Sequence, residues 1–203
     1  MIPRKLHLIW VGDSESPDYV QTNFDMWKSL MPDWDCKLWV NDDITSDVFP
    51  VDLVNSATKG AQKADIMRYF ILKKFGGVYM DTDVTPHKSL EPIIHMSDFV
   101  ACHDLEITWS YVAIGFIASI PEHHIMAELC DRCHTVTLNT EDIHMHTGPR
   151  LFGDVVMKYH TEVFFLSTEY FYRNTKGDMW IDRSIRTDDF EHRFGNHFYA
   201  KCW

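Results

Sequence analysis

The sequence has few basic residues, and this shortage limits the partners that the protein can bind. Its 203 residues include 19 Lys and Arg against 30 Asp and Glu, which gives a formal net charge of -11. Because the basic residues are also dispersed, a nucleic-acid duplex would be repelled, and we expect no nucleic-acid partner. An acidic protein that holds a phosphorylated ligand needs a cation as intermediary, so metal-binding carboxylates are the first feature to seek.

Long apolar runs and targeting signals are also missing. No stretch approaches the roughly 20 apolar residues that a membrane-spanning helix requires. The opening residues, MIPRKLHLIWVG, have one basic pair and a short apolar run before charge and glycine resume, unlike a signal peptide. These features predict a cytoplasmic protein without a membrane span.

Cysteine is too sparse for a disulfide framework. The chain has five cysteines, an odd number, and we expect reduced thiols. Cys130, Cys133 and His134 match the C-x-x-C-H pattern of haem attachment, but they follow a segment of helical character. Buried helical thiols are therefore the favoured interpretation.

Linkers, repeats and low-complexity tracts are absent, so the sequence offers no internal domain boundary. With 45% hydrophobic residues, the chain can build a substantial core. We therefore predict one domain over residues 1–203.

The hydrophobic pattern predicts a mixed α/β protein. Residues 5–11 and 36–40 have strand character, and residues 17–30 between them have helical length, which gives a β-α-β opening. A second helix is expected from Ala64 to the Gly76-Gly77 pair, where a left-handed cap would stop it. Further strands are predicted at residues 78–80, 98–102, 111–119 and 163–166, with helices at 121–134, begun by its proline, and at 154–159, after a turn at 147–153.

An Asp-x-Asp sequence follows the apolar run VYM. In an extended chain alternate side chains share a face, so Asp81 and Asp83 are expected to point the same way. Two carboxylates on one face suit Mg²⁺ or Mn²⁺ and the oxygens of a diphosphate. The alternative is an ordinary solvated acidic turn.

The preceding helix strengthens the metal interpretation. Asp65 and Arg68 lie three residues apart on one helical face, and from Asp65 to the helix end the chain rises about 15 Å. After the Gly-Gly break, five strand residues recover roughly 16 Å. Asp81 should therefore return beside the first turn of the helix, at the edge of the sheet where α/β proteins bind ligands. The alternative is a salt bridge between Asp65 and Arg68 alone.

These segments together resemble a known family. The run ADIMRYFILKKFGGVYMDTDV, with IPRKLHLIWVG, TGPRLFG and a terminal HFYAKCW, is similar to the DXD-containing sugar transferases. That family includes yeast α-mannosyltransferases and the glucosylating domains of large clostridial toxins. The chain also resembles small glycosyltransferases encoded by large algal viruses.

The resemblance implies a fold and a reaction. The fold would be GT-A, an α/β fold with a Rossmann-like nucleotide-binding mixed sheet flanked by helices. The reaction would move a hexose from a nucleotide sugar, with UDP-glucose or a related UDP-sugar favoured, to a hydroxyl of a glycan or glycoprotein acceptor. Retention of anomeric configuration is the family precedent, and Mn²⁺ or Mg²⁺ would be the cofactor.

The resemblance also assigns residues to roles. Asp81 and Asp83 match the pair that binds the metal and the diphosphate, and Asp65 and Arg68 match the positions that hold donor-sugar hydroxyls. These four are the expected catalytic residues. The other expected donor contacts are Trp10 on the base, Asn41 at the ribose, Tyr79 beside the aspartate pair, and Thr147 and Gly148 on the sugar and acceptor side.

The tail of the chain carries the last expected contacts. His197 would complete the metal site and Trp203 would approach the diphosphate, although Cys202 stands where the family has a serine. Ile114 occupies a position where the family often has asparagine. If transfer inverted the sugar, a base would be needed on the acceptor side, and His103 or Asp104 would be the first candidates.

Two other functions fit parts of the sequence. DTDVT also matches the D-x-D-x-T nucleophile motif of haloacid-dehalogenase-type phosphohydrolases. Those enzymes carry the motif on their first strand, and here Lys158 stands where their second acid is expected. A non-catalytic sugar-binding module is the other alternative.

Overall fold

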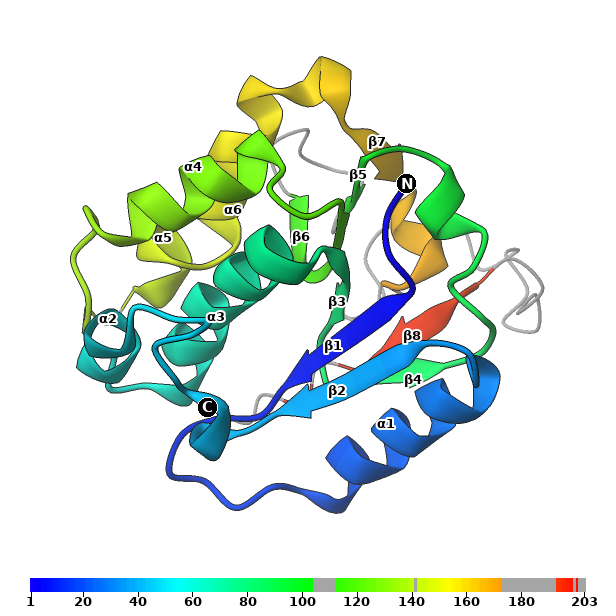
Figure 1. Ribbon diagram of the computed structural model, residues 1–203, viewed down its shortest axis with the longest axis horizontal. Coiled ribbons are helices and arrows are strands. Elements are labelled where there is room, and N and C mark those ends of the chain that lie inside the picture. Colours follow the sequence, from blue (N-terminus) through cyan, green and yellow to red (C-terminus); the bar gives the residue numbers. More distant parts are fainter. Residues whose placement is uncertain (104–111, 141, 173–192, 199, 201–203) are drawn as a thin grey trace, which may run out of the picture.

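A six-stranded mixed sheet forms the centre of the protein. The computed structural model describes residues 1–103, 112–140, 142–172, 193–198 and 200. The sheet has the order β2-β1-β3-β6-β5-β7, with β1 parallel to β2 and β3, β6 antiparallel to β3 and β5, and β7 parallel to β5 (Figure 1). The bounds are β1 Lys5–Ile9, β2 Asp35–Trp39, β3 Gly77–Met80, β5 Phe99–His103, β6 Val112–Ser119 and β7 Phe164–Leu166.

Helices cover one face of this sheet, and a helix with a small two-stranded sheet covers the other. Among the described residues, α2 (Val51–Ser56), α3 (Gly60–Phe75), α4 (His124–Cys133), α5 (Ile143–His146) and α6 (Pro149–Lys158) lie together (Figure 1). On the opposite side are α1 (Asp18–Leu30) and a two-stranded antiparallel sheet of β4 (Val84–Pro86) and β8 (Gly195–His197). The predicted α/β sheet flanked by helices is confirmed.

Successive side chains along a strand point to opposite faces of the sheet, so the strands contribute to a hydrophobic core on each side. Val78 and Met80 of β3 pack on the side of α1, whereas Tyr79 between them packs on the side of α3. Leu8 and Ile9 of β1 divide in the same way. This two-sided burial is expected of parallel strands covered on both faces.

The Gly-Gly break redirects the chain from α3 into β3. Gly76 and Gly77 have φ angles of 60° and 97°, a region that favours glycine. A Cβ on Gly77 would lie 2.7 Å from the carbonyl oxygen of Lys5, so the close approach of β3 to β1 also requires a residue without a side chain. The predicted reversal after the helix is therefore present.

Three predicted helix starts are wrong. Helix α3 begins at Gly60, four residues before the predicted Ala64. Helix α4 begins at His124 instead of residue 121, because the His123 Nδ1 accepts a hydrogen bond from the Ile125 N–H and caps the helix there. Helix α6 begins at Pro149 instead of residue 154, because a proline suits the first helical position, where its missing N–H is not needed.

The thiols of α4 lie in the core, as predicted. Cys130 and Cys133 are buried and free, and burial raises the pKa of Cys130 to about 12. Such thiols stay protonated and unreactive at neutral pH. Of the helices in the described ranges, none has the length and apolar character needed to cross a membrane.

Candidate active site

A cleft of about 340 Å³ opens where β1 and β3 end. Its outer part is formed by the loop after β1, including Trp10, and by the start of α3 at Lys59. Ile114 of β6 and Pro149 of α6 contribute apolar side walls. Ligands commonly bind at this edge of an α/β sheet, so the cleft is the candidate active site.

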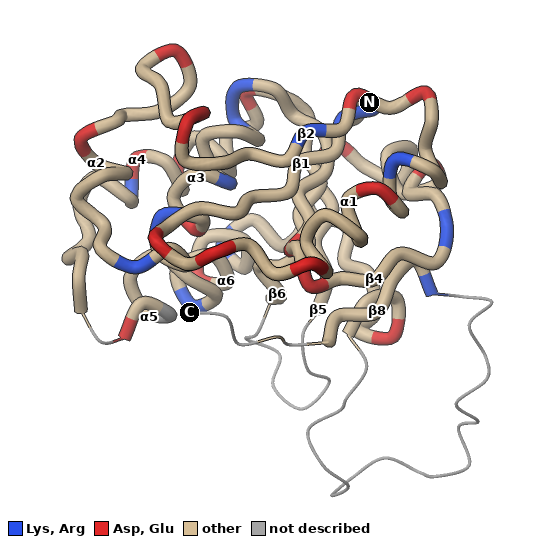
Figure 2. Tube along the Cα trace, turned by 90° about the horizontal axis from the view of Figure 1, so that it is seen from below, with Lys and Arg blue, Asp and Glu red and all other residues tan. Residues whose placement is uncertain are grey.

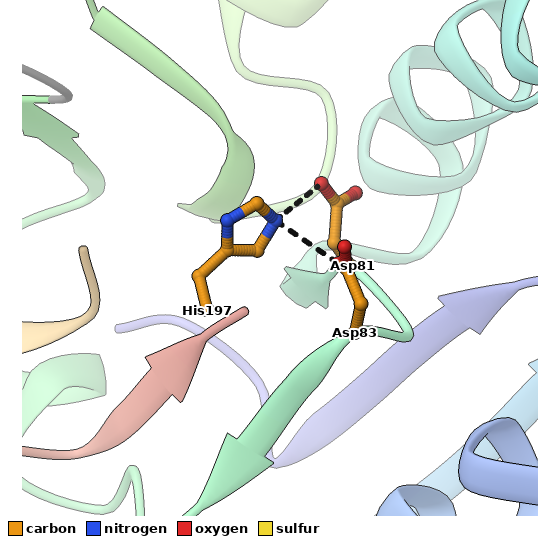
Figure 3. Close-up of side chains that lie close together, drawn as sticks. All are labelled: Asp81, Asp83 and His197. Carbon is orange, nitrogen blue, oxygen red and sulfur yellow. Dashed lines mark ion pairs between the residues drawn. The ribbon is translucent and has the colours of Figure 1, made fainter. Parts of the chain in front are cut away.

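Three potential metal ligands meet at the cleft: Asp81 and Asp83 line it, and His197 lies directly beside them. The His197 Nε2 lies 3.0 Å from an Asp83 carboxylate oxygen and 3.7 Å from one of Asp81 (Figure 3). One ligand atom from each of the three residues lies within 4.8 Å of the others. The predicted grouping of Asp81, Asp83 and His197 is thus present in space.

The two aspartates converge for a different reason from the one predicted. The chain is not extended between them: β3 ends at Met80, and a turn follows in which the Val84 N–H donates to the Asp81 carbonyl at 3.3 Å. Alternation along a strand therefore does not apply. The turn, and not the pleat, directs both carboxylates toward His197.

The small β4–β8 sheet brings His197 to the aspartates. Val84, directly after the Asp-x-Asp sequence, pairs with His197 in antiparallel register. The Ala200 N–H donates to an Asp83 carboxylate oxygen at 2.8 Å, and the Phe198 N–H donates to the Asp83 carbonyl at 3.1 Å. The C-terminal segment thus contributes both a ligand and backbone support to the site.

The charges of the three ligands depend on one another. Burial alone would lower the pKa of His197, but hydrogen bonds from its ring to Asp81 and Asp83 raise that pKa to about 9. Burial would raise the pKa of Asp81, but Arg68 and His197 lower it to about 2. In the metal-free protein at neutral pH, an imidazolium therefore lies between two carboxylates.

Arg68 links the carboxylate of Asp65 to that of Asp81. Its guanidinium lies 3.0 Å from Asp65 and 3.5 Å from Asp81, and it donates to the Ile114 carbonyl at 2.8 Å. Asp81 does return beside Asp65 and Arg68, as predicted, but these residues lie beyond the first turn because α3 begins at Gly60. We call Asp65, Arg68, Asp81, Asp83 and His197 the cleft floor.

Ile114 contributes its backbone where the family often has an asparagine. Its main-chain carbonyl accepts the Arg68 N–H at 2.8 Å. The side chain remains part of the apolar wall.

Tyr79 fixes the orientation of Asp81. Its hydroxyl donates to Asp81 Oδ1 at 2.6 Å, and its ring lies under the Arg68 guanidinium, 4.4 Å from the ring centroid. Burial and the nearby Asp81 charge raise the pKa of Tyr79 well above its ordinary value, so the phenol keeps its proton. One Asp81 oxygen is held by Tyr79, while the other faces His197.

The residues predicted for the base and the ribose lie at the outer end. Trp10 is half-buried and lines the cleft, so it is not a core tryptophan, and its Nε1–H donates to the Ser14 carbonyl at 3.3 Å. Asn41 exchanges two hydrogen bonds with the Gly12 backbone, at 3.0 and 2.9 Å, and so fixes the loop after β1. Asn41 is not among the residues that line the cleft.

Thr147 and Gly148 lie behind the cleft wall. Thr147 is fully buried and its hydroxyl donates to Asp65 Oδ2 at 3.2 Å, while Gly148 is the N-cap of α6. Their neighbours Ile143 and Pro149 line the cleft instead. The other predicted acceptor-side residue, His103, stacks on Phe165 at 4.8 Å and does not line the cleft.

Three predicted site residues, Asp104, Cys202 and Trp203, lie outside the described residues. One residue that the sequence interpretation missed is Gly115 of β6. Its carbonyl accepts the Asp81 N–H at 2.8 Å, and a Cβ there would lie 2.6 Å from Asp81 Oδ2. A glycine inside a strand marks a close approach, and this signal was available in the sequence.

The fold is that of the GT-A glycosyltransferases. The structure superposes on PaToxG glycosyltransferase with a TM-score of 0.60 at 14% identity, covering 78% of this chain and 69% of that one. For the UDP-bound glycosyltransferase domain of the YGT toxin the TM-score is 0.56 at 12% identity, with 81% and 79% covered. For the galactosyltransferase LgtC in complex with donor and acceptor sugar analogues it is 0.55 at 11% identity, with 95% and 86% covered.

Sequence comparison gives the same class. Residues 17–100 match the family described as the glycosyltransferase sugar-binding region containing a DXD motif. The chain is 26% identical over 166 residues to the uncharacterized glycosyltransferase L373 of Acanthamoeba polyphaga mimivirus, covering 78% of this chain and 66% of that protein. Viral proteins are thus among its relatives, while an algal-virus source stays a prediction.

Fungal relatives are similar over a shorter stretch. Inositol phosphoceramide mannosyltransferase 1 of Schizosaccharomyces pombe is 29% identical over 130 residues, covering 60% of this chain and 40% of that protein. The chain spans about two thirds or less of the length of these curated relatives.

The phosphohydrolase alternative receives no support. It required the Asp-x-Asp sequence on the first strand, whereas here the pair follows β3, with β1 and β2 earlier in the chain. Asp81, which would be the nucleophile, is held by Arg68 and Tyr79.

Proposed function

We propose that the protein transfers a hexose from a nucleotide sugar to an acceptor hydroxyl and depends on a divalent metal ion. UDP-glucose or a related UDP-sugar is the favoured donor. The observation that carries the proposal is the convergence of Asp81, Asp83 and His197 within 4.8 Å at a cleft that also contains Arg68 and Trp10.

The residues fit a divalent cation. Two carboxylates and one imidazole form a mixed oxygen and nitrogen donor set, which suits Mn²⁺ better than the all-oxygen preference of Mg²⁺. The three floor carboxylates and one guanidinium leave two negative charges when His197 is neutral. A bound divalent ion would balance that charge and, with a donor in place, would neutralise the leaving diphosphate.

The remaining floor residues would act on the sugar. Asp65 carries a fixed negative charge that can accept hydrogen bonds from sugar hydroxyls, and it stabilises positive charge as the sugar approaches an oxocarbenium ion. Arg68 holds Asp65 and Asp81 in fixed relation. Such preorganisation lowers the barrier because the groups need not reorient during the reaction.

The outer end of the cleft would bind the nucleoside. Trp10 offers a half-exposed aromatic surface on which a base can stack. The Asn41 contacts to Gly12 hold the loop that carries Asp13 and Ser14 into the cleft. Base recognition is thus assigned to a loop, and diphosphate recognition to the turn after β3.

Retention of configuration is the favoured stereochemical outcome. An inverting enzyme needs a general base beside the acceptor. In the described ranges, the carboxylates that line the cleft are Asp13 in the outer loop and the floor aspartates. The floor aspartates already have partners in the metal and sugar sites, and this supports transfer in which the leaving phosphate accepts the proton of the acceptor.

The acceptor is proposed as a glycan or glycoprotein hydroxyl, and the proposed location is the cytoplasm. The fungal relatives are inositol phosphoceramide mannosyltransferases, whose name contains a lipid, inositol phosphoceramide. An acceptor panel should therefore include a glycolipid headgroup beside free sugars and glycopeptides.

Turnover of nucleotide sugars tests the proposal. The protein is incubated with Mn²⁺ and a panel of UDP- and GDP-sugars, and release of nucleoside diphosphate is measured. We expect release from at least one donor, loss of it with EDTA, and loss of it in Asp81→Ala and Asp83→Ala. Asp131→Ala, an exposed aspartate on α4, is the matched control and should retain activity.

Two results would contradict the proposal. Release of inorganic phosphate from sugar phosphates would indicate a phosphohydrolase. Binding of a sugar nucleotide without any turnover, in the presence of metal and the acceptor panel, would indicate a binding module.

A further inference from the structure

Asp65 is held at both carboxylate oxygens by donors from different parts of the chain. Arg68, one helical turn away on α3, lies 3.0 Å from Oδ1. The Thr147 hydroxyl, between α5 and α6, donates to Oδ2 at 3.2 Å. Because these two donors lie on opposite oxygens, together they fix the rotation of the carboxylate about its χ angles.

Thr147 is itself held rigidly. Its carbonyl accepts the Tyr69 hydroxyl at 2.7 Å, and its N–H donates to the Ile143 carbonyl at 3.1 Å. Tyr69 is fully buried and stacks on Phe152 of α6 with ring centroids 6.3 Å apart. The Thr147 hydroxyl is thus a donor at a fixed position, built from packed elements.

Thr147 has no access to a ligand in the cleft. Its exposed fraction is 0%, and Ile143 and Pro149 line the cleft on either side of it in sequence. Asp65 does line the cleft. Any influence of Thr147 on a bound sugar must therefore pass through Asp65.

We propose that Thr147 is a positioning residue that orients Asp65 toward the donor sugar. This inference rests on the proposed function, because Asp65 is assigned there to the sugar. It replaces the direct sugar contact expected from the family resemblance. It also gives the segment between α5 and α6 a role in recognising the sugar.

The test compares a donor that has the sugar with one that lacks it. In the presence of Mn²⁺, dissociation constants for UDP-glucose and for UDP are measured by calorimetry for the wild type, Thr147→Val and Thr147→Ser. Valine keeps the shape but removes the hydroxyl, and serine restores it. We expect Thr147→Val to weaken UDP-glucose binding about tenfold, the value of one hydrogen bond to a charged group, with UDP binding unchanged.

The variants separate a positioning role from a structural one. Thr147→Ser should return UDP-glucose binding toward the wild-type value. Thr168→Val is the matched control: Thr168 is also buried, and its hydroxyl has no hydrogen-bond partner in the described ranges. Thr168→Val should leave the ratio of the dissociation constants for UDP-glucose and UDP unchanged. Equal weakening of UDP and UDP-glucose in Thr147→Val, or no weakening of either, would overturn the proposal.

A second measurement needs no donor. Urea unfolding of Thr147→Val, Asp65→Ala and the double variant forms a double-mutant cycle. We expect the threonine substitution to shift the unfolding midpoint less when Asp65 is already absent. Additive shifts would show that the two side chains do not interact and would overturn the proposal. A wild type that binds neither UDP nor UDP-glucose would instead refute the UDP-sugar donor of the proposed function, and the cycle would still decide whether Thr147 holds Asp65.

Discussion

His7 in the sheet core and His197 on the cleft floor are both buried histidines, but they titrate in opposite directions. The His7 ring lies between the Gly76 carbonyl at 3.0 Å and the Trp39 Nε1–H at 3.2 Å, both neutral groups. Burial lowers the pKa of His7 to about 4. His197 lies between two carboxylates, which overcome burial and raise its pKa to about 9.

The two histidines show two ways in which this protein accommodates buried polar groups. In the core, each polar atom of His7 is matched by one neutral partner, and no charge is left over. On the cleft floor, three carboxylates share Arg68 and His197, so one negative charge remains even when the imidazole is protonated. Buried charge without a partner costs stability. The floor is therefore the region where a cation ligand contributes most.

Removal of Arg68 should have the largest effect. Arg68→Met leaves Asp65 and Asp81 as buried carboxylates without their shared cation, which should lower the free energy of unfolding by about 3–5 kcal/mol. Nucleoside diphosphate release should fall by at least about a hundredfold. Urea unfolding and turnover with Mn²⁺ measure the two effects.

The control is an arginine whose salt bridge is exposed. Arg4 pairs with Glu91 at the surface, and Arg4→Met should leave both unfolding and turnover close to the wild type. If Arg4→Met and Arg68→Met had the same effect on unfolding, the distinction between the floor and the rest of the molecule would be lost.

His7 should make stability depend on pH in the acidic range. Because its folded pKa of about 4 lies below the unfolded value of 6.5, the unfolded chain takes up a proton that the folded protein rejects. The free energy of unfolding should therefore fall as the pH drops from 6.5 toward 4, by about 2–3 kcal/mol between pH 7 and 4.5. Urea unfolding at both pH values measures it.

The His7→Gln variant isolates this contribution. Glutamine does not titrate, so its loss of stability between pH 7 and 4.5 should be smaller than that of the wild type by the same amount. Equal losses in both proteins would mean that other groups cause the acid dependence and that His7 is not held neutral by the core.

The sequence alone predicted that Asp81 lies near Asp65 and Arg68. The prediction rested on the rise of a helix and the return of a strand, and the structure confirms it. The strand argument failed at Asp83, because the chain turns after Met80 and a turn cannot be distinguished from an extended end by residue type alone.

The other floor residues depend on long-range pairing. His197 is 114 residues beyond Asp83, and nothing local links them; only the family resemblance indicated it. Thr147 was assigned to the cleft, but its burial depends on how α5 and α6 pack. The start of α6 was missed because TGPRLFG contains turn-forming residues, whereas Pro149 in fact begins the helix.

Gly115→Ala should disturb the floor without altering its charge. An added Cβ would lie 2.6 Å from Asp81 Oδ2, so the Asp81 carboxylate must shift from its position. A small displacement of a catalytic group is costly, and we expect turnover to fall about tenfold to a hundredfold. Ala118→Gly on the same strand changes the core without contacting Asp81, and should lower stability but not turnover. Full activity in Gly115→Ala would show that the position of Asp81 is not critical.

Trp10→Ala should have the smallest effect and should act only on binding. Trp10 is half-buried at the outer end, so its removal leaves no buried charge and little cavity. Loss of stacking should weaken UDP binding about tenfold, with unchanged urea unfolding. Trp10→Phe keeps an aromatic ring and should recover most of the affinity. If Trp10→Ala destabilised the protein as much as Arg68→Met, the outer end would be part of the structural core, and the contrast between a loop that binds the base and a buried charged floor would be wrong.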